Sequence, residues 1–460
     1  MIYEFYGCLS GEKKEEGGRQ RTGLEFQVVE RHLLDVFLRA ECKRQMVSEK
    51  HEEVFRAFEE DGMGHERFRK IKVRYLGDME FRLLSVYFEN LEYARYRYEN
   101  WYFVRFSDEK NGLSGTVYDC SLYDWGGEDS EEINAYCNLE MLPREQAENL
   151  KKLYDPYLPE ESDMRQEKGA GLKAIGAGTV FQAVRFVYVG AALCAVLLDN
   201  LGTEVAFFDL GTRVSGVMAL AAKQPSAQNA RNAILTCLQQ IGPGNPMTIF
   251  ISHWHVDHVN ALGIYLTNHG NLNNIVNHSE WYVPASGCPM FMWIQGMVPA
   301  ASFHAYPRGA AQAPVNVAGN PNIQVGKIDL QGNLHAHHQG LYVTITLASG
   351  NRVLLVGDTT YEGLPVGIRT NGGAGYDCLQ VCHHGGDYYL PPANQNAGTA
   401  MGFIPTAAVG ATAVYSADGR TYGHPDPFFV GHHQGQGYTA ANEWNLNQGA
   451  VGGTFFRDYQ

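Results

Sequence analysis

The chain has 460 residues, 45% of them hydrophobic, so it is long enough for more than one cored domain and too apolar to be disordered. Its 36 basic and 50 acidic side chains give a net charge of −14, which argues against a broad surface for a nucleic-acid backbone. No stretch reaches the roughly 18 uninterrupted apolar residues of a membrane span, and the first residues lack a secretion-signal pattern. The nine cysteines are scattered without a CxxC pair, which favours reduced thiols and a cytoplasmic location.

Charge and histidine are distributed in opposite ways along the chain. Residues 1–170 hold 36 acidic side chains, 25 basic side chains and three histidines. Residues 171–460 hold 14 acidic side chains, 11 basic side chains and fourteen histidines. Because imidazole is a common metal ligand, the part with few charges is the part equipped to bind metal. The sequence therefore predicts two domains, a charged accessory domain over residues 1–165 and a catalytic domain over residues 170–460.

The first of these domains is predicted to be α+β. Apolar residues at helical spacing predict amphipathic helices over residues 24–45 and 51–60. Between residues 71 and 123 the pattern shortens to alternation, which is typical of an antiparallel sheet, here expected to be a meander. A last helix is expected over residues 143–154.

Tyrosine and arginine interleave over residues 91–106, a pattern that fits a nucleic-acid stacking surface as well as a half-buried strand pair. The strand pair is favoured, because strands prefer these residue types in any case. No motif in the first domain carries recognisable chemistry. An accessory or protein-partner role is therefore its default assignment.

After residue 171, short apolar runs between Gly, Asn and Pro loops predict the strands of a layered α/β domain with its site at the strand ends. The runs are TVFQAVRFVYV, AALCAVLLDN, TEVAFFDLG, MTIFISH, WYVPA, LYVTITLA, RVLLVGD, CLQVCHH and AAVGATAVYS. Residues 307–322 are expected to form a long flexible loop near the site. His432 and His433, in GHHQGQG, are expected to lie in a polar loop.

A dense group of metal-ligand side chains follows the apolar run MTIFI. It comprises His253, His255, Asp257 and His258. In an extended loop the first two project to the same side, and the last two stand at the turn into a helix, so all four converge on a volume for two metals. The alternative is a solvated loop that happens to be rich in histidine, and the spacing disfavours it.

Two metals about 4 Å apart need a shared carboxylate and further histidines. The candidates are Asp358 after RVLLVG, His383 and His384 after LQVC, and His337 and His338 before LYVTI. Zn²⁺ suits imidazole, and carboxylates add oxygen donors that Mn²⁺ or Fe also accept. The expected cofactor is a pair of divalent metal ions, with Zn²⁺ favoured.

In this order along residues 170–430, these segments resemble the metallo-β-lactamase superfamily. Within it they are most similar to the C-terminal hydrolase domain of ComEC-type DNA-uptake proteins and its stand-alone relatives. The matching motifs are AIGAGTVFQAV, AFFDLGTR, SHWHVDHVNAL, LLVGD, LQVCHHGG and VYSADGRTYGHPDP. The resemblance implies an αββα four-layer sandwich, so the expected fold is α/β, preceded by the smaller α+β domain.

The chain departs from the family pattern at three places. Thr179 stands where an acidic residue often follows Gly-x-Gly, and Gly386 replaces a common serine after His-His-Gly. His337 and His338 stand where this subgroup often carries asparagine. In this respect the chain resembles the wider superfamily, where a histidine at this point completes the first metal site. The resemblance therefore favours a full dinuclear centre.

The resemblance also implies a role for each residue. The first metal is expected on His253, His255 and either His337 or His338, the second on Asp257, His258 and His383, with Asp358 as the bridge and Asp209 as a buried helper. A hydroxide held between the metals would be the nucleophile. Asp257, His384 and His424 are the candidate catalytic residues; the two histidines either contact the oxyanion or leaving group, or make supporting hydrogen bonds.

The superfamily cleaves many bond types, so the resemblance predicts a reaction type and leaves the substrate open. The subgroup favours a phosphodiesterase, including nuclease activity, on nucleic acid or a small nucleotide-like diester. Eleven basic residues after residue 170 are few for a polymer backbone, so a small molecule or a nucleic-acid end is expected. Arg213, Arg308, Arg369 and Arg420 are candidates for a local clamp.

Two alternatives remain for the function. One is a hydrolase of a carboxylic ester, lactone or lactam. The other is a metal-binding sensor or partner-binding protein without catalysis, which the complete set of ligands disfavours.

Overall fold

The computed structural model describes residues 2–15, 21–30, 82–89, 100–107, 113–121, 132–144, 147, 174–187, 189, 192–212, 225–255, 258, 259, 261–263, 265, 272–286, 289–307, 311–329, 339–385, 403–416, 425, 427–442 and 456–460. The chain divides into two compact units. The first comprises Met1–Gly169 and Ser286–Ala300, and the second comprises Ala170–Ala285 and Ala301–Gln460. The accessory or partner-binding role of residues 1–165 stays a prediction.

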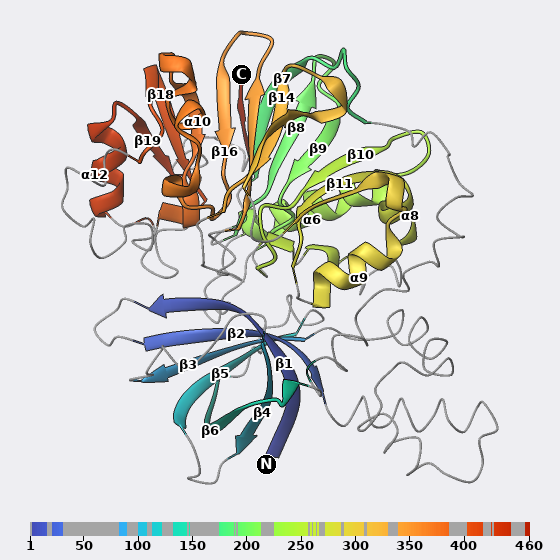
Figure 1. Cartoon of the computed structure of the whole chain (residues 1–460), viewed down its shortest axis with the longest axis vertical. Helices are drawn as coiled ribbons and strands as arrows, with labels where there is room; N and C mark the ends of the chain where they lie inside the picture. Colours follow the sequence, from blue (N-terminus) through green and yellow to red (C-terminus); the bar gives the residue numbers. More distant parts are fainter. Residues whose placement is uncertain are drawn as a thin grey trace. The chain divides into compact units, whose positions relative to one another are not determined.

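The first unit contains a closed antiparallel barrel, visible in blue to teal in Figure 1. Its strands are β1 (Ile2–Glu15), β2 (Arg21–Glu30), β3 (Arg82–Glu89), β4 (Trp101–Ser107), β5 (Leu113–Ser121) and β6 (Glu132–Met141). The order around the barrel is β1-β2-β3-β5-β6-β4, and β4 pairs with β1 to close it. The expected meander is therefore wrong, because β5 and β6 lie between β3 and β4. Closure leaves the sheet without an open edge.

The helix predicted over residues 24–45 is wrong in its first part, where residues 24–30 belong to β2. Leu24 and Phe26 are both fully buried, which is the period of two that a strand requires. Pairing with β1 and β3 on either side stabilises the extended backbone. The rest of that segment and residues 51–60 lie outside the described residues.

Three of the predicted strand runs of this unit are confirmed, and part of its last predicted helix can be compared with the structure. The runs FRLLSVYF, WYFVRFS and TVYDCSLY do form β3, β4 and β5. In the helix expected over residues 143–154, the described part shows Ala147 donating its N–H to the Pro143 carbonyl at 3.0 Å, the spacing of an α-helical turn. The unit also includes α9 (Pro289–Met297).

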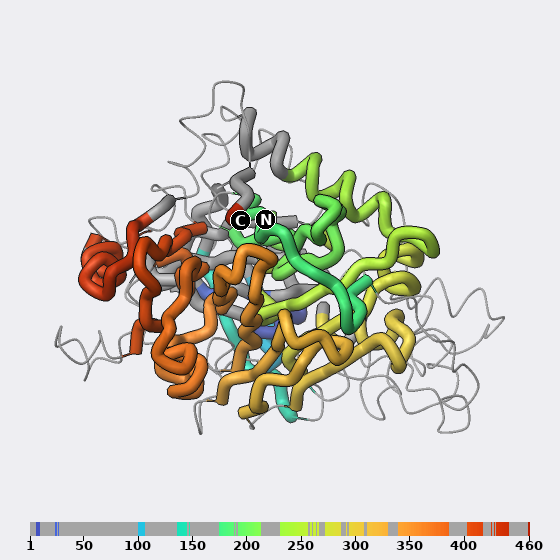
Figure 2. The backbone as a smooth tube through the Cα atoms, turned by 90° about the horizontal axis from the view of Figure 1, so that it is seen from above, coloured from blue at the N-terminus to red at the C-terminus, as the bar shows by residue number. Residues whose placement is uncertain are grey.

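The second unit contains two seven-stranded sheets. In the first, the order is β12 (Phe303–Tyr306), β11 (Ser279–Pro284), β10 (Met247–Phe250), β9 (Glu204–Phe208), β8 (Ala195–Asp199), β7 (Phe181–Val187) and β20 (Phe456–Tyr459). In the second, it is β13 (Gln312–Asn316), β14 (Ile323–Lys327), β15 (Leu341–Thr346), β16 (Arg352–Leu355), β17 (Tyr376–Gln380), β18 (Ala407–Tyr415) and β19 (Thr439–Asn442). The red end of the chain lies beside green β7 in Figure 2, where β20 pairs antiparallel with it.

The sheets pack face to face through an apolar core to which both contribute, including Phe208 and Phe250 from one sheet and Val343 and Leu355 from the other. Helices α6 (Pro225–Gln240) and α8 (Asn273–Asn277) belong to the first sheet's outer layer, and α10 (Val366–Thr370) and α12 (Pro427–Gly435) cover the second sheet (Figure 1). The short 3₁₀ turns are Ala300–Ser302, Val317–Gly319, Tyr361–Gly363, Asn371–Gly373 and Cys382–Gly385. The predicted α/β fold with four layers is confirmed.

All nine apolar runs predicted as strands of this unit overlap one: β7, β8, β9, β10, β11, β15, β16, β17 and β18. The flexible loop expected over residues 307–322 is wrong, because β13 pairs with β14 there and a 3₁₀ turn, Val317–Gly319, follows. The polar loop expected around His432 and His433 is also wrong. Both lie in α12, and His433 is fully buried. No helix among the described residues is long and apolar enough to cross a membrane.

The topology brings several strand ends together. Strands β9 and β10 run parallel in the first sheet, as β16 and β17 do in the second, so the residues after each pair emerge at one edge. The N–H of Leu341, at the start of β15, donates to the carbonyl of Ser252, just after β10, at 2.8 Å. This bond joins the two sheets at the edge where the candidate site lies.

Candidate metal centre

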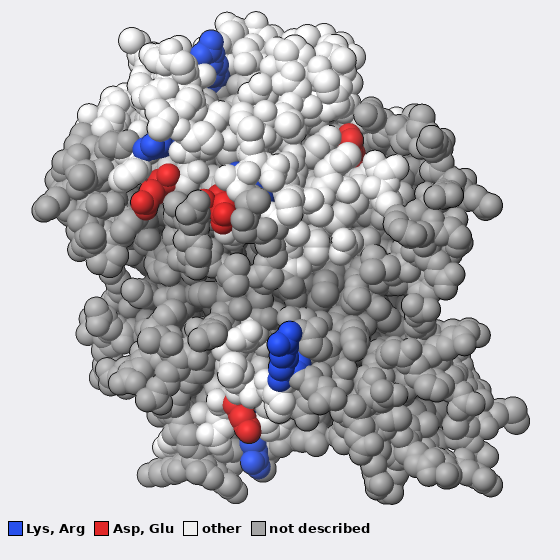
Figure 3. Space-filling view, viewed as in Figure 1, with Lys and Arg blue, Asp and Glu red and all other residues white. Residues whose placement is uncertain are grey.

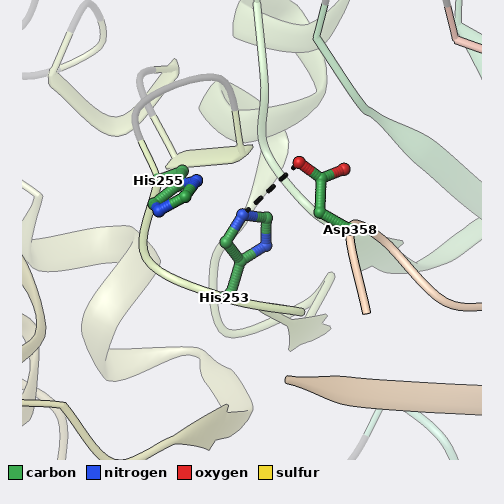
Figure 4. Close-up of side chains that lie close together, drawn as sticks. All are labelled: His253, His255 and Asp358. Atoms are coloured by element: carbon green, nitrogen blue, oxygen red, sulfur yellow. Dashed lines mark ion pairs between the residues drawn. The ribbon is translucent and has the colours of Figure 1, made fainter. Parts of the chain in front are cut away.

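The loop after β10 presents His253 and His255 on one side. Trp254, between them, is buried, and its indole N–H donates to the Pro284 carbonyl at 2.8 Å. Because side chains alternate along an extended segment, this anchor directs the two histidines away from β11. Their ring centroids lie 4.4 Å apart, and in Figure 4 His253 points at the carboxylate of Asp358.

Asp358 follows β16 on a turn that a glutamine holds in place. The backbone N–H groups of Val356 and Gly357 both donate to Oε1 of buried Gln380, at 3.0 and 2.7 Å. Gly357 has a φ of 57°, and a Cβ there would lie 2.1 Å from Oγ of Ser252. Glycine is therefore required both for the backbone conformation and for the close approach of the two loops.

The two carboxylate oxygens of Asp358 face different histidines. Oδ2 lies 3.6 Å from Nε2 of His253 and 3.9 Å from Nε2 of His383. Oδ1 lies 3.3 Å from Nε2 of His258 and 3.7 Å from Nε2 of His384. The ligand atoms fall within 4.8 Å of one another in two groups, His253 with His255 and Asp358, and His258 with Asp358 and His384. One carboxylate thus belongs to two clusters of metal-ligand type.

The charge state of Asp358 suits such a position. Burial alone would raise the pKa of its carboxyl, but the attraction of His258, His384 and His383 outweighs burial and holds this pKa well below its usual range. The side chain is therefore a carboxylate at neutral pH, and this negative charge favours positive charge in the site.

A buried hydrogen-bond network orients the histidines. Asp209 Oδ2 accepts the Nδ1–H of His258 and the hydroxyl of Ser252, both at 2.7 Å, and its Oδ1 accepts the Ser252 backbone N–H at 2.6 Å. Because the Ser252 hydroxyl donates to Asp209, its oxygen accepts from Nδ1 of His253, 3.0 Å away. Nδ1 of His253 and of His258 thus carries a proton, and Nε2 of each ring faces Asp358, where it would ligate a metal ion through its lone pair once it gives up its own proton.

His383 and His384 form a strained turn after β17. Both have left-handed backbone conformations, with φ of 47° and 59°, which cost of order 1–3 kcal/mol each and persist where the surroundings enforce them. The Nδ1–H of His384 donates to the Ser416 carbonyl at 2.8 Å, so Nε2 is the ring nitrogen that faces Asp358. The His383 ring is partly exposed, with 16% of its side chain accessible.

The structure brings together six of the residues singled out from the sequence, namely His253, His255, His258, Asp358, His383 and His384. Asp257, His337, His338 and His424 lie outside the described residues, as do Gly386, Arg213, Arg308 and Arg420, so their roles stay predictions. Thr179, the departure after Gly-x-Gly, accepts the Gly176 N–H on its hydroxyl at 2.9 Å and closes that turn.

Arg369 does not lie at the candidate site. Its carbonyl accepts the Thr406 N–H, and the Thr406 carbonyl accepts the N–H of Tyr376, the first residue of β17. The metal-ligand histidines follow the last residue of β17, so Arg369 is at the other end of that strand. Its guanidinium stacks 5.1 Å above the ring of Phe403. Its place in the expected arginine clamp is therefore wrong.

Two supporting residues were missed from the sequence: Ser252 and Gln380. Ser252 adjoins the histidine motif, and its position directly after a buried strand was a usable signal. Gln380 stands between apolar Leu379 and Val381 at the end of a buried strand, where an unexplained polar side chain indicates a buried partner.

The approach of Gly357 to Ser252 can be tested with a pair of glycine substitutions. Gly357→Ala should destabilise the protein by about 3 kcal/mol or more, because alanine adds a clash to the cost of a left-handed backbone. Gly350, with φ of 88° and no atom within 4 Å of the point where a Cβ would lie, is the matched control. Gly350→Ala should cost about 1 kcal/mol and leave metal affinity unchanged. Urea unfolding and metal titration of both variants measure this, and equal losses would refute the role of the close approach.

Comparison with known proteins matches part of the chain to a family model. Residues 221–378 match the family model of the metallo-beta-lactamase superfamily. No curated protein matches the chain. The matched segment includes the histidines after β10 and Asp358, and it ends before the turn at His383. The chain therefore carries, over residues 221–378, a match to the metallo-beta-lactamase superfamily, and the histidines and aspartate clustered there and just beyond it could hold metal, which supports a metal-dependent hydrolase.

Proposed function

We propose that the second unit is a dinuclear metal-dependent phosphodiesterase that acts on a small nucleotide-like diester or on a nucleic-acid end. The observation that carries the proposal is the division of Asp358 between two histidine clusters, Oδ2 toward His253 and Oδ1 toward His258. A carboxylate that serves two cations at once needs this arrangement. Such a centre hydrolyses esters of several kinds, so the choice of a phosphodiester needs support of its own.

The donor set fits a pair of divalent metal ions. Imidazole nitrogens suit Zn²⁺, and the shared carboxylate adds an oxygen donor that Mn²⁺ or Fe also accepts. His253, His255 and Asp358 would hold one ion, and His258, His384 and Asp358 the other. Asp257 and either His337 or His338 are proposed as further ligands on the basis of the sequence motif. The pair of ions would supply a water of lowered pKa and offset negative charge on the ester.

The hydrogen bonds and exposure of His383 and His384 favour other roles for these two residues than the sequence predicts. His384 donates Nδ1–H to a carbonyl, so Nε2 is the nitrogen that would ligate, as in His258. His383 has a more exposed ring near the same carboxylate. We therefore assign His384 to the second ion and His383 to the substrate side, where a histidine can bind a phosphoryl oxygen or protonate the leaving oxygen.

The motif resemblance to ComEC-type hydrolase domains supports phosphodiesters as the substrate class, and the distribution of charge supports a small substrate. Where the second unit is described, Arg185 pairs with Glu204 at 3.1 Å, and Lys327 is buried. On the face drawn in Figure 3, the described atoms show isolated basic side chains without a gathered patch. A polymer backbone needs many such charges, whereas a single diester needs few.

A substrate comparison tests the proposal. With added Mn²⁺ or Zn²⁺, the protein should hydrolyse bis-p-nitrophenyl phosphate, cleaving one P–O bond to release p-nitrophenol and the monoester. Nitrocefin and simple lactones should react at least about 100-fold more slowly, which corresponds to about 2.7 kcal/mol at the transition state. Turnover of the carboxylic substrates alone would refute the phosphodiesterase and favour the lactone or lactam alternative. No hydrolysis of either class by the metal-loaded protein would favour a binding protein.

A further inference from the structure

The turn that carries His383 and His384 is attached to a buried tyrosine outside the centre. Tyr361 lies in the 3₁₀ turn Tyr361–Gly363, shortly after Asp358, and is almost fully buried. Its hydroxyl oxygen accepts the backbone N–H of Cys382, the first residue of the histidine turn, at 3.2 Å. The same turn is tied to Gly357, whose carbonyl accepts the His383 N–H at 3.3 Å.

The tyrosine is in turn held by a histidine from the last layer of the fold. Nε2 of His433, in α12, lies 3.0 Å from the Tyr361 hydroxyl, and Nδ1 lies 2.8 Å from the carbonyl of Phe429. A carbonyl can only accept, so Nδ1 carries the proton and Nε2 accepts the tyrosine O–H. The bonds therefore run in one direction, from Cys382 N–H to the Tyr361 oxygen and from the Tyr361 O–H to His433.

Burial keeps both members in the states that this chain of bonds requires. It lowers the pKa of His433 to about 4, against the hydrogen bond to Phe429, so the ring is neutral at pH 7. Burial also raises the pKa of Tyr361 well above its usual range, so the hydroxyl keeps its proton. The rings of Tyr415 and Tyr438 pack against His433, with centroids 5.6 and 6.3 Å away.

We propose that Tyr361 and His433 are positioning residues for the metal centre, which hold the Cys382 amide and thereby aim His383 and His384 at Asp358. Two successive left-handed residues that are not glycine need enforcement from outside the turn, and this pair provides it. The inference rests on the proposed function, because it concerns residues that would bind the second ion and the substrate.

The test compares two tyrosines of the same buried cluster. Tyr361→Phe removes the hydroxyl that binds the turn. The matched control is Tyr438→Phe, because the Tyr438 hydroxyl donates to the carbonyls of Pro405 and Thr406 and does not touch the histidine turn. Tyr361→Phe should weaken binding of the second Co²⁺ or Zn²⁺ by about 10- to 100-fold in competition with a chelator, whereas Tyr438→Phe should leave it within about threefold.

Spectroscopy and a second pair of variants separate positioning from general stability. The visible absorption of the Co²⁺ protein should change in Tyr361→Phe and match wild type in Tyr438→Phe. His433→Leu, which removes the acceptor, should repeat the loss of affinity, and His433→Gln, which keeps one, should largely restore it. These His433 variants decide the matter if Tyr361→Phe does not fold.

The outcomes separate this inference from the proposed function. Wild-type affinity for the second ion in both tyrosine variants, or the same loss of affinity in both, would overturn the inference while the proposed function stands. A wild-type protein that binds no second ion would overturn the proposed function, and the inference with it.

Discussion

Replacing Asp358 by asparagine should abolish hydrolysis, with kcat/KM lower by about 10³-fold or more, or about 4 kcal/mol at the transition state. The carboxylate has one oxygen toward each histidine cluster, so the substitution affects both. An amide is neutral and presents N–H₂ on one side, which cannot ligate a cation. The second metal should therefore be lost, and the first should bind more weakly.

Asp377→Asn is the matched control for this substitution. Asp377 lies on β17 of the same sheet, where Oδ2 accepts the Arg352 backbone N–H at 2.8 Å, and an asparagine oxygen can accept that bond equally well. Steady-state kinetics and metal analysis of both variants measure the effect. Retention of wild-type activity in Asp358→Asn would contradict a bridging carboxylate.

Replacing Asp209 by asparagine should cost about 3 kcal/mol of folding free energy and weaken metal binding by about 10- to 100-fold. Asp209 is completely buried and accepts three hydrogen bonds, from the Ser252 hydroxyl and N–H and from His258. Asparagine tolerates the left-handed backbone at this position, where φ is 59°, so the substitution tests the chemistry of the side chain. Its N–H₂ group would face a donor, and His258 would lose the partner that orients its ring.

A graded comparison checks that account. Ser252→Ala removes one of the three donors to Asp209 and the acceptor of the His253 Nδ1–H, but it leaves the charged bond from His258 intact, so it should cost about 1–2 kcal/mol, less than Asp209→Asn. Denaturant unfolding gives the stabilities, and a chelator competition gives the metal affinities. If Asp209→Asn unfolds at the wild-type denaturant concentration, the buried network does not support the site.

The sequence was most informative where one local pattern decides the structure. Buried strands of the second unit are short apolar runs between turn residues, and their C-terminal ends carry the metal-ligand side chains. Asp358 could be placed because it directly follows such a run. Whether its two oxygens divide between two clusters could not be predicted, because this depends on how the loops after β10, β16 and β17 meet.

The errors arise where distant pairing or packing outweighs the local pattern. Residues 24–30 have apolar side chains that fit both a helix and a strand, and pairing with β1 and β3 selects the strand. Strands β1 and β6 were not predicted at all; the end of β1, GEKKE, has no apolar alternation. His433 was assigned to a loop because glycines surround it, although Phe429 and His433 are buried on one side of α12.

The supporting shell of the centre was the least predictable part. Gln380, Tyr361 and His433 belong to different elements, and each acts through one hydrogen bond or two. No local spacing links Tyr361 to His433, which is 72 residues further along the chain. Such partners become visible only when the fold brings them together.

The number of divalent metal ions bound by each wild-type chain tests the central claim most directly. The metal-free protein would be titrated with Zn²⁺ and with Mn²⁺ by calorimetry, and the bound metal counted by elemental analysis after removal of free ions. Two clusters that share Asp358 predict two ions per chain. A chain that retains no ion would contradict a dinuclear centre. So would a chain that binds one ion and reaches its full hydrolytic activity with that single ion.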